Sequence, residues 1–281
     1  MEISEKSGEH RNVMRLLSVL DALSKASADG LRLTDVVEAT GIGKTTAHRI
    51  LSGLLSQNLA EQDGETGRFF IGVKMLSWAT AARDRFSLVR LVEPALMRIS
   101  RQTQDTIYLV VRSGDDVVCL DCREGTFPIK VLTLNVGDRR PLGIGAGSLA
   151  IMAALPDAEV DRIFVGNAEA MSAYPFDEVR LRQMIATTRQ NDYSYNNVHV
   201  LQGLENVTEM AGIGVPIRKS DGMPVAALHL TSVTSRLDPP RRDNLVATLH
   251  QEARQIEAQL EPVLAMVAAT DRHLAKPGIN Y

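Results

Sequence analysis

Residues 37–51 read VEATGIGKTTAHRIL, and the glycines in this stretch decide how the N-terminal part of the chain folds. The end of the stretch resembles a nucleotide-binding P-loop, G-x-x-x-x-G-K-[ST], which follows a buried strand. The first glycine of that motif would stand at position 38, which is Glu38. The preceding residues LTDVVEAT follow helical spacing, with Thr34 as the expected N-cap and Gly41 just past the helix end. A helix in front of the loop argues against a nucleotide site.

The same glycines fit the turn of a helix-turn-helix. The segment RNVMRLLSVLDALSKA before them places five apolar side chains on one helical face, namely Val13, Leu16, Leu17, Leu20 and Leu23. A further helix, expected to begin near Thr45, directs Ala47, Ile50, Leu51, Leu54 and Leu55 toward a core. Its other face carries Lys44, Thr45, Thr46, His48, Arg49 and Ser52. Cations and short hydrogen-bonding groups of this kind reach phosphates and base edges in a major groove.

A hairpin is expected directly after these helices. The stretch NLAEQDGETGRFFIG contains two short extended runs around DGETG. Helices followed by a hairpin predict a winged helix-turn-helix over residues 1–72, with Arg68 on the wing, where it could contact the DNA backbone or minor groove. A winged helix that serves only protein contacts is the alternative. The polar outer face of the last helix favours double-stranded DNA as the partner.

The composition sets the class of protein. The chain has 281 residues, 44% of them hydrophobic, and a net charge of −3, which suits two folded domains and does not exclude a local basic surface. No apolar run approaches the roughly eighteen residues of a membrane span. The N-terminus MEISEKSGEHRN is polar and lacks the apolar region of an export signal. We therefore expect a cytoplasmic protein without a membrane partner.

The two cysteines, Cys119 and Cys122, have the C-x-x-C spacing that is typical of redox-active or metal-binding sites. The surrounding sequence IYLVVRSGDDVVCLDC predicts two strands joined at SGDD, and residues i and i+3 of a regular strand point to opposite faces. A metal also requires about four ligands. We expect two strand cysteines, with no metal and no cofactor.

The motifs together resemble the isocitrate lyase regulator (IclR) family of transcription factors. The N-terminal resemblance rests on RNVMRLLSVLDALS, on LTDVVEATGIGKTTAHRILSGLLSQNLAEQD and on RFFIGVKML; the C-terminal one rests on PLGIGAGSLAIMA and GIGVPIRKSDGMPVAALHLTSVTSR. The resemblance implies a dimer or dimer of dimers in which each chain has a DNA-binding domain, a linker helix and a GAF-like α/β effector domain. It also implies a repressor or activator that responds to a small metabolite, often a small carboxylate or an aromatic acid.

A linker helix is expected over residues 73–89, where the sequence lacks glycine and proline. Trp78 and an apolar edge of Met75, Leu76, Ala79 and Ala82 would be exposed on an isolated helix. Burial against the linker of a partner chain removes this exposure. Packing against the chain's own domain is the alternative.

Residues 90–281 predict an α+β domain with a mainly antiparallel sheet. The segment LVEPALMRISRQTQ is an amphipathic helix, the two strands around SGDD follow it, and IKVLTLNVG is expected to be a third strand. Then come the helix DEVRLRQMIATTRQ, a hairpin that turns at Asp221-Gly222, and a long helix from Pro239 to Val267.

A ligand site is expected where the glycine-rich stretch from Gly143 to Ser148 opens a helix, because free N–H groups and the helix dipole suit an anion. On the strand 225–231, His229 and Thr231 share one face and need partners if they are buried. Close helix–sheet packing and a structural histidine are the alternatives. The family resemblance implies effector contacts at Val131, Gly145, Ala146, Asn196, His229 and Thr231.

The sequence departs from the family pattern near this site. Asn196 and Asn197 stand where an acidic residue is common, and Ser148 stands where a basic residue often begins the helix. These departures leave the chemical class of the ligand open. A hydrolase using Ser148 is an alternative, but G-x-S-x-G is absent and no motif places an Asp/His pair, so we expect no enzyme.

Overall fold

The fold was obtained as a computed structural model that describes residues 2–26, 29–85, 87–174, 177–197 and 210–274. The chain divides into two compact units, Met1–Arg85 and Phe86–Tyr281. No helix in the described part of the chain has the length and the apolar run needed to cross a bilayer.

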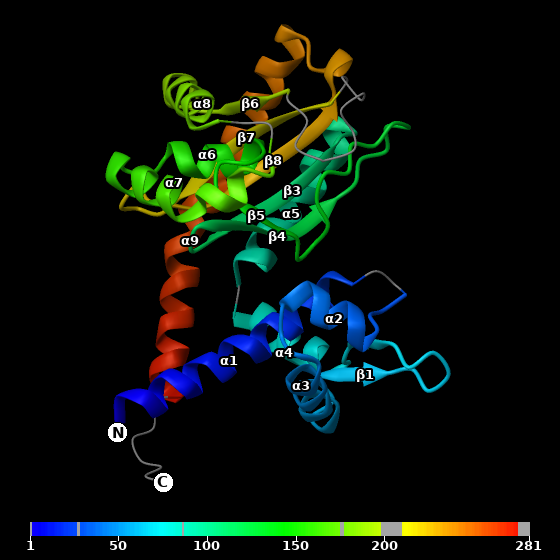
Figure 1. The fold of residues 1–281 in the computed structure, drawn as a ribbon. Helices are drawn as coiled ribbons and strands as arrows, with labels where there is room; N and C mark the ends of the chain where they lie inside the picture. Colours follow the sequence, from blue (N-terminus) through cyan, green and yellow to red (C-terminus); the bar gives the residue numbers. More distant parts are fainter. Residues whose placement is uncertain (1, 27–28, 86, 175–176, 198–209, 275–281) are drawn as a thin grey trace. The chain divides into compact units, whose positions relative to one another are not determined.

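The first unit is a winged helix-turn-helix (Figure 1). Its elements are α1 (Glu2–Lys25), α2 (Leu33–Thr40), α3 (Lys44–Ser56), β1 (Ala60–Gln62), β2 (Phe69–Ile71) and α4 (Lys74–Arg85). The strands β1 and β2 pair as an antiparallel hairpin. Helical spacing on α1 and α3 supplies the core, which contains Val19, Leu23, Val36, Ile42, Ala47, Leu51, Leu54 and Phe69. The predicted helix-turn-helix and wing are confirmed.

The turn between α2 and α3 depends on Gly41. Its φ of 66° is left-handed, a conformation that glycine adopts at little cost, and its N–H donates to the carbonyl of Val37 at 2.9 Å. The prediction of Thr34 as N-cap is wrong, because α2 begins at Leu33 with Arg32 in the cap position. The Arg32 N–H donates to the Asp35 carboxylate at 2.8 Å. A side chain in the first turn of α2 therefore provides the acceptor for this backbone N–H at the helix start.

The second unit is a six-stranded antiparallel sheet covered by helices on both faces. The strand order is β5-β4-β3-β8-β7-β6, and the strands are β3 (Thr106–Ser113), β4 (Asp116–Arg123), β5 (Arg139–Pro141), β6 (Ser194–Asn196), β7 (Met210–Arg218) and β8 (Pro224–Val233). One face carries α6 (Ala146–Ala153), α7 (Asp157–Met171) and α8 (Glu178–Asn191) (Figure 1). The other carries α5 (Ser87–Thr103) and α9 (Pro239–Leu274), with a 3-10 turn at Thr234–Arg236 before α9.

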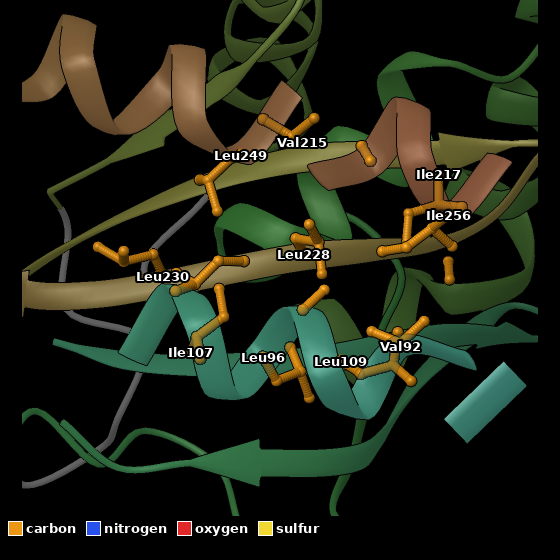
Figure 2. Close-up of a cluster of buried hydrophobic side chains, with 14 of the residues drawn as sticks. Val92, Leu96, Ile107, Leu109, Val215, Ile217, Leu228, Leu230, Leu249 and Ile256 are labelled. Atoms are coloured by element: carbon orange, nitrogen blue, oxygen red, sulfur yellow. The ribbon is translucent and has the colours of Figure 1, made fainter. Parts of the chain in front are cut away.

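The alternation of side chains along β8 divides the core in two. Leu228 and Leu230 point toward α5 and α9, where they pack in the cluster of Figure 2 with Val92, Leu96, Ile107, Leu109, Val215, Ile217, Leu249 and Ile256. Ala227 faces the opposite way, toward the cluster beneath α6 and α7. The period of two that the sequence predicts is therefore confirmed for residues 226–231. It is wrong for Val225, which stands at an irregularity in the pairing with β7 and packs with the cluster of Leu228 and Leu230.

The third strand predicted over IKVLTLNVG is wrong. Residues 124–138 have no helical or strand hydrogen-bond pattern, and only Arg139–Pro141 pairs with β4. Side chains of the sheet hold this segment instead. The Tyr108 hydroxyl donates to the Val131 carbonyl and accepts from the Thr133 N–H, each at 3.2 Å. The Val131 carbonyl and the Thr133 N–H therefore have hydrogen-bond partners without pairing with a neighbouring strand.

A bulge in β4 corrects the expected geometry of the two cysteines. Tyr108 pairs with Cys122 and Val110 pairs with Cys119, which leaves Leu120 as an extra residue in β4. Both thiols therefore project to the same face, contrary to the rule for a regular strand. Burial raises the pKa of Cys119 to about 12 and that of Cys122 to about 11, so both are neutral thiols at neutral pH. The described residues contain no cluster of metal-binding side chains.

Candidate nucleic-acid interface and ligand cavity

The outer face of α3 is free to meet a partner. Ala47, Leu51 and Leu54 anchor the helix in the core of the first unit. The opposite face exposes Lys44, Thr45, His48, Arg49 and Ser52, while Thr46 is half-buried at its margin. The helical period thus separates the anchoring residues from the six predicted DNA contacts.

The electrostatics of this face suit an anionic partner. The side chains of Lys44, His48 and Arg49 make no hydrogen bond or ion pair with any residue in the described ranges. The first turn of α3 contains no acidic residue, and no side chain caps its N-terminus at Gly43. Free N–H groups, the positive end of the helix dipole and Lys44 can therefore act together on a phosphate.

The wing gives Arg68 a partner within its own unit. The Arg68 guanidinium donates to the carbonyl of Gly30 at 2.9 Å and so ties β2 to the connection between α1 and α2. The wing tip carries Asp63 and Glu65, and hydrogen bonds from Thr66 hold the pKa of Asp63 below its usual value. An acidic tip repels phosphates, so contact between Arg68 and DNA stays a prediction without electrostatic support from the wing.

In the second unit, one cavity brings together all six residues that the family resemblance names. It lies between the start of α6, the strands β6, β7 and β8, and the segment 124–138, and its volume is about 30 Å³. The residues that line it are Val131, Thr133, Gly145, Ala146, Asn196, Met210, Ala211, Gly212, His229 and Thr231. Thr133 and the three β7 residues are additions that the sequence pattern does not reveal, although the pairing of Gly212 with Thr231 follows once β7 and β8 are neighbours.

Glycines bring the helix α6 close to the sheet at this cavity. A Cβ on Gly147 would lie 2.7 Å from the Cβ of His229, closer than packed carbon atoms allow. Gly145 differs, because its φ is 91° and a Cβ there would meet no atom within 4 Å. Gly147 therefore allows α6 to pack closely against the sheet, whereas Gly145 borders unfilled space at the cavity.

His229 is a buried neutral imidazole. Its side chain is 5% exposed, and burial lowers its pKa to about 3, with a further contribution from the positive charge of Arg140. Its ring centroid lies 5.5 Å from that of Tyr108. Neither ring nitrogen has a hydrogen-bond partner among the described residues. A neutral imidazole offers one donor and one acceptor, so His229 can bind either kind of group.

The neighbouring polar groups are arranged around Val131. The Thr231 hydroxyl donates to the Val131 carbonyl at 2.7 Å, which holds the backbone of Val131 at the cavity wall. The hydroxyl of Thr133 is buried and has no partner in the described structure. The ring of His229 therefore leaves hydrogen-bonding capacity at the cavity wall for a polar molecule.

Arg140 supplies positive charge next to the cavity. It is buried, donates to the Thr133 carbonyl, and forms no ion pair with any carboxylate that the structure describes. Burial lowers its pKa because the charged form loses hydration. The cavity lining within the described ranges contains no acidic residue. A buried cation without a counter-charge favours an anion nearby.

Comparison with known proteins identifies the chain. The model of the bacterial transcriptional regulator IclR C-terminal domain matches residues 80–258, and the model of the IclR helix-turn-helix domain matches residues 12–64. The chain belongs to the IclR family. It is a transcriptional regulator with an N-terminal helix-turn-helix DNA-binding domain and a C-terminal ligand-binding domain.

The similarity extends over nearly the whole length of individual relatives. The HTH-type transcriptional regulator KipR of Bacillus subtilis is 26% identical over 90% of this chain and 98% of its own. The fold matches an IclR-type regulator from Alicyclobacillus acidocaldarius with a TM-score of 0.73 at 20% identity, covering 88% of this chain and 98% of that one. An IclR homolog from Microbacterium hydrocarbonoxydans, complexed with 4-hydroxybenzoate, matches with a TM-score of 0.70 at 19% identity over 89% and 99%.

Proposed function

We propose that this IclR-family regulator changes its affinity for an operator when a small organic acid binds in the cavity between α6 and β8. The observation that carries the proposal is the cavity itself. Segments that are far apart in the sequence converge there, and they bring a neutral His229, the unpartnered hydroxyl of Thr133 and the start of α6 to the same small space.

The charges support a carboxylate as the ligand. The start of α6 presents the positive end of its dipole, Arg140 lies buried nearby, and no acidic residue lines the described cavity. The Microbacterium protein bound to 4-hydroxybenzoate shows that an aromatic hydroxy acid is a ligand within this fold. We infer the same broad class for this chain, with Val131, Gly145, Ala146, Asn196, His229 and Thr231 as its contacts.

The size of the cavity links binding to a conformational change. A volume of about 30 Å³ is far below the roughly 300–1,000 Å³ of sites for small organic ligands, so an organic acid fits only when the walls move apart. A ligand then favours the wider state by its difference in affinity for the two states. Coupling energies of this kind are typically about 1–3 kcal/mol, enough to alter the occupancy of an operator.

On the DNA side we propose that Lys44, Thr45, Thr46, His48, Arg49 and Ser52 enter the major groove. The Ser52 hydroxyl donates to the His48 carbonyl at 2.9 Å and still has lone pairs for an external donor. Lys44 at the start of α3 suits a phosphate, and Arg49 one turn further suits a base edge or phosphate. Because the proposed partner is a DNA operator, we place the protein in the cytoplasm.

We also propose that the chain acts as a dimer. Within the first unit, α4 leaves Leu76 67% exposed and Trp78 50% exposed, and α1 leaves Val13 and Leu17 about half exposed. Ala82 lies where side chains are not described. An apolar surface of this extent suits a second copy of the chain, and two-fold symmetry would present two copies of α3 to half-sites about one helical turn, or a multiple, apart.

The contacts of Ser148 favour a structural role for this residue over a hydrolytic one. The Ser148 hydroxyl accepts from the Gly143 N–H at 2.8 Å and lies 3.5 Å from the Pro141 carbonyl, so it stabilises the loop before α6. The relatives are transcriptional regulators. We expect Ser148→Ala to leave the rate of p-nitrophenyl acetate hydrolysis at the wild-type background, and a clear loss of turnover would support an enzyme instead.

Replacement of His229 and Gly145 tests the ligand site. A gel-shift titration would use DNA from upstream of the gene, with 4-hydroxybenzoate and other small carboxylates as candidate effectors. We expect His229→Ala and Gly145→Val to abolish the effector response while binding without effector persists. His250→Ala, which removes a histidine from α9 outside the cavity, serves as the control and should respond normally. A response that survives both cavity substitutions would place the effector elsewhere.

A further inference from the structure

A second and larger cavity opens at the edge of the sheet, between α8, β6 and the start of α9. Its volume is about 390 Å³, against about 30 Å³ for the cavity at His229. Its lining consists of Arg180, Gln183, Met184, Thr187, Thr188, Asn191, Tyr193, Tyr195 and Arg242. Sites for small organic ligands usually have volumes of about 300–1,000 Å³, so this cavity has room for one in its present shape.

The lining combines positive charge with aromatic surface. Arg180 and Arg242 contribute two guanidinium groups, and none of the residues that line the cavity in the described structure is acidic. The Arg242 guanidinium lies 5.0 Å from the ring centroid of Tyr195, within the range of a cation–π contact. A guanidinium binds a carboxylate through two parallel hydrogen bonds, and a phenol ring offers a flat face to another ring.

One donor in the lining lacks an acceptor. The Nε of Arg242 is buried and has no hydrogen-bond partner in the part of the chain that the structure describes. A buried N–H without an acceptor is costly, and the bidentate carboxylate contact of an arginine commonly uses this atom. The Nε itself is too enclosed to touch a ligand in the cavity as it stands, so the volume and the positive charge of the lining are what a bound acid would complement.

We infer that this second cavity binds a small planar organic acid, such as an aromatic carboxylate, through Arg242 and Tyr195. The site is separate from the effector cavity of the proposed function, although β6 borders both. Tyr195 lines the second cavity and Asn196 lines the first. Because these residues are consecutive, a ligand that moves Tyr195 also shifts the backbone that carries Asn196.

Fluorine NMR titration of the full-length chain with 4-fluorobenzoate tests this inference. We expect Arg242→Gln to weaken one binding component by roughly tenfold or more, as the loss of a charge-assisted hydrogen bond predicts. Arg254→Gln removes the same charge from an exposed position on α9 and should bind like the wild type. The neutral 4-fluorobenzamide should not occupy the site. Identical titrations for Arg242→Gln and Arg254→Gln would overturn the inference.

Two further measurements distinguish this site from the His229 cavity and replace the Arg242→Gln test if that variant does not fold. In a His229→Ala chain the component that depends on Arg242 should persist, which separates this site from the effector cavity. If Arg242→Gln does not fold by circular dichroism, crystals of the wild type with 4-bromobenzoate decide the question. An anomalous bromine peak between α8 and α9 supports the inference. A peak confined to the His229 cavity, no peak, or a segment of a second copy between α8 and α9 overturns it.

Discussion

At the scale of single residues, Arg49 is an exposed cation on α3 whose side chain, like that of Lys44, has no partner in the described structure. We expect Arg49→Ala to weaken operator binding by about 1–3 kcal/mol if it contacts a base, with relaxed specificity at one position. If it contacts a phosphate, all sequences should weaken alike and the salt slope should fall by about one.

Fluorescence anisotropy with operator and scrambled DNA at several salt concentrations distinguishes these two contacts. Arg101→Ala, an exposed arginine on α5 in the second unit, is the matched control. Affinity and salt slope that remain unchanged in Arg49→Ala would remove this residue from the interface.

The depressed pKa of His229 makes the stability of the second unit depend on pH. The unfolded chain binds a proton near pH 6.5, whereas the folded chain does so only near pH 3, so stability is lost as the pH falls below about 6.5. This difference amounts to about 2 kcal/mol at pH 5 and nearly vanishes at pH 7.5.

Urea denaturation of the wild type and of His229→Gln at both pH values measures the effect. Glutamine does not titrate. Between pH 7.5 and pH 5, the free energy of unfolding of the wild type should therefore fall by about 2 kcal/mol relative to that of His229→Gln. A gap that is independent of pH would show that the histidine is accessible to protons in the folded state.

At the scale of elements, the buried carboxylate of Asp105 fastens the end of β8 and the start of α9 to the loop before β3. It accepts hydrogen bonds from the Ser232 hydroxyl at 2.7 Å, from Arg236 at 3.1 Å and from Arg241 at 2.6 Å. Arg236 also stacks on Phe127, at 3.8 Å from the ring centroid, at the beginning of the segment that walls the effector cavity. One carboxylate therefore holds the end of β8 and the start of α9 in position.

Asp105→Asn leaves two arginines without their counter-charge. We expect it to lower the free energy of unfolding by about 3–5 kcal/mol, the usual cost of breaking a buried pair from one side. Asp116→Asn removes a carboxylate that pairs with Arg139 at the surface, at 2.7 Å, and should cost less than about 1 kcal/mol. Chemical denaturation followed by circular dichroism compares the two, and equal losses would contradict the special role of Asp105.

At the scale of the whole molecule, the proposed regulator depends on the apolar surface of α1 and α4. Leu76→Arg places a charge on that surface and should dissociate the dimer. Because two linked half-sites gain roughly a hundredfold or more in avidity, operator affinity should fall by a similar factor.

Sedimentation velocity and gel shift measure both consequences. Val165→Arg changes an equally apolar, 82% exposed side chain on α7 and should alter neither property. A Leu76→Arg protein that sediments like the wild type would show that the copies associate through another surface.

Features that depend on local backbone geometry could be predicted from the order of the amino acids. A glycine at position 41 predicts the turn between two helices, because the left-handed conformation is open to few other residues. The alternation along 225–231 separates His229 and Thr231 from Leu228 and Leu230, because successive side chains of a strand point to opposite faces. The outer face of α3 follows in the same way from the helical period, so its Lys44 and Arg49 could be named in advance.

The tertiary structure alone decided what depends on partners far away in the sequence. The bulge at Leu120 put both cysteines on one face, and the Gly30 carbonyl, 38 positions away, gave Arg68 its partner. Side-chain bonds from Tyr108 and Thr231 held residues 124–138 without a strand. Neither the buried charge of Arg140 nor the cavity at Arg242 leaves a periodic signal, because each arises where separate elements meet. Local periods follow from backbone geometry, whereas cavities and burial exist only once the elements have packed.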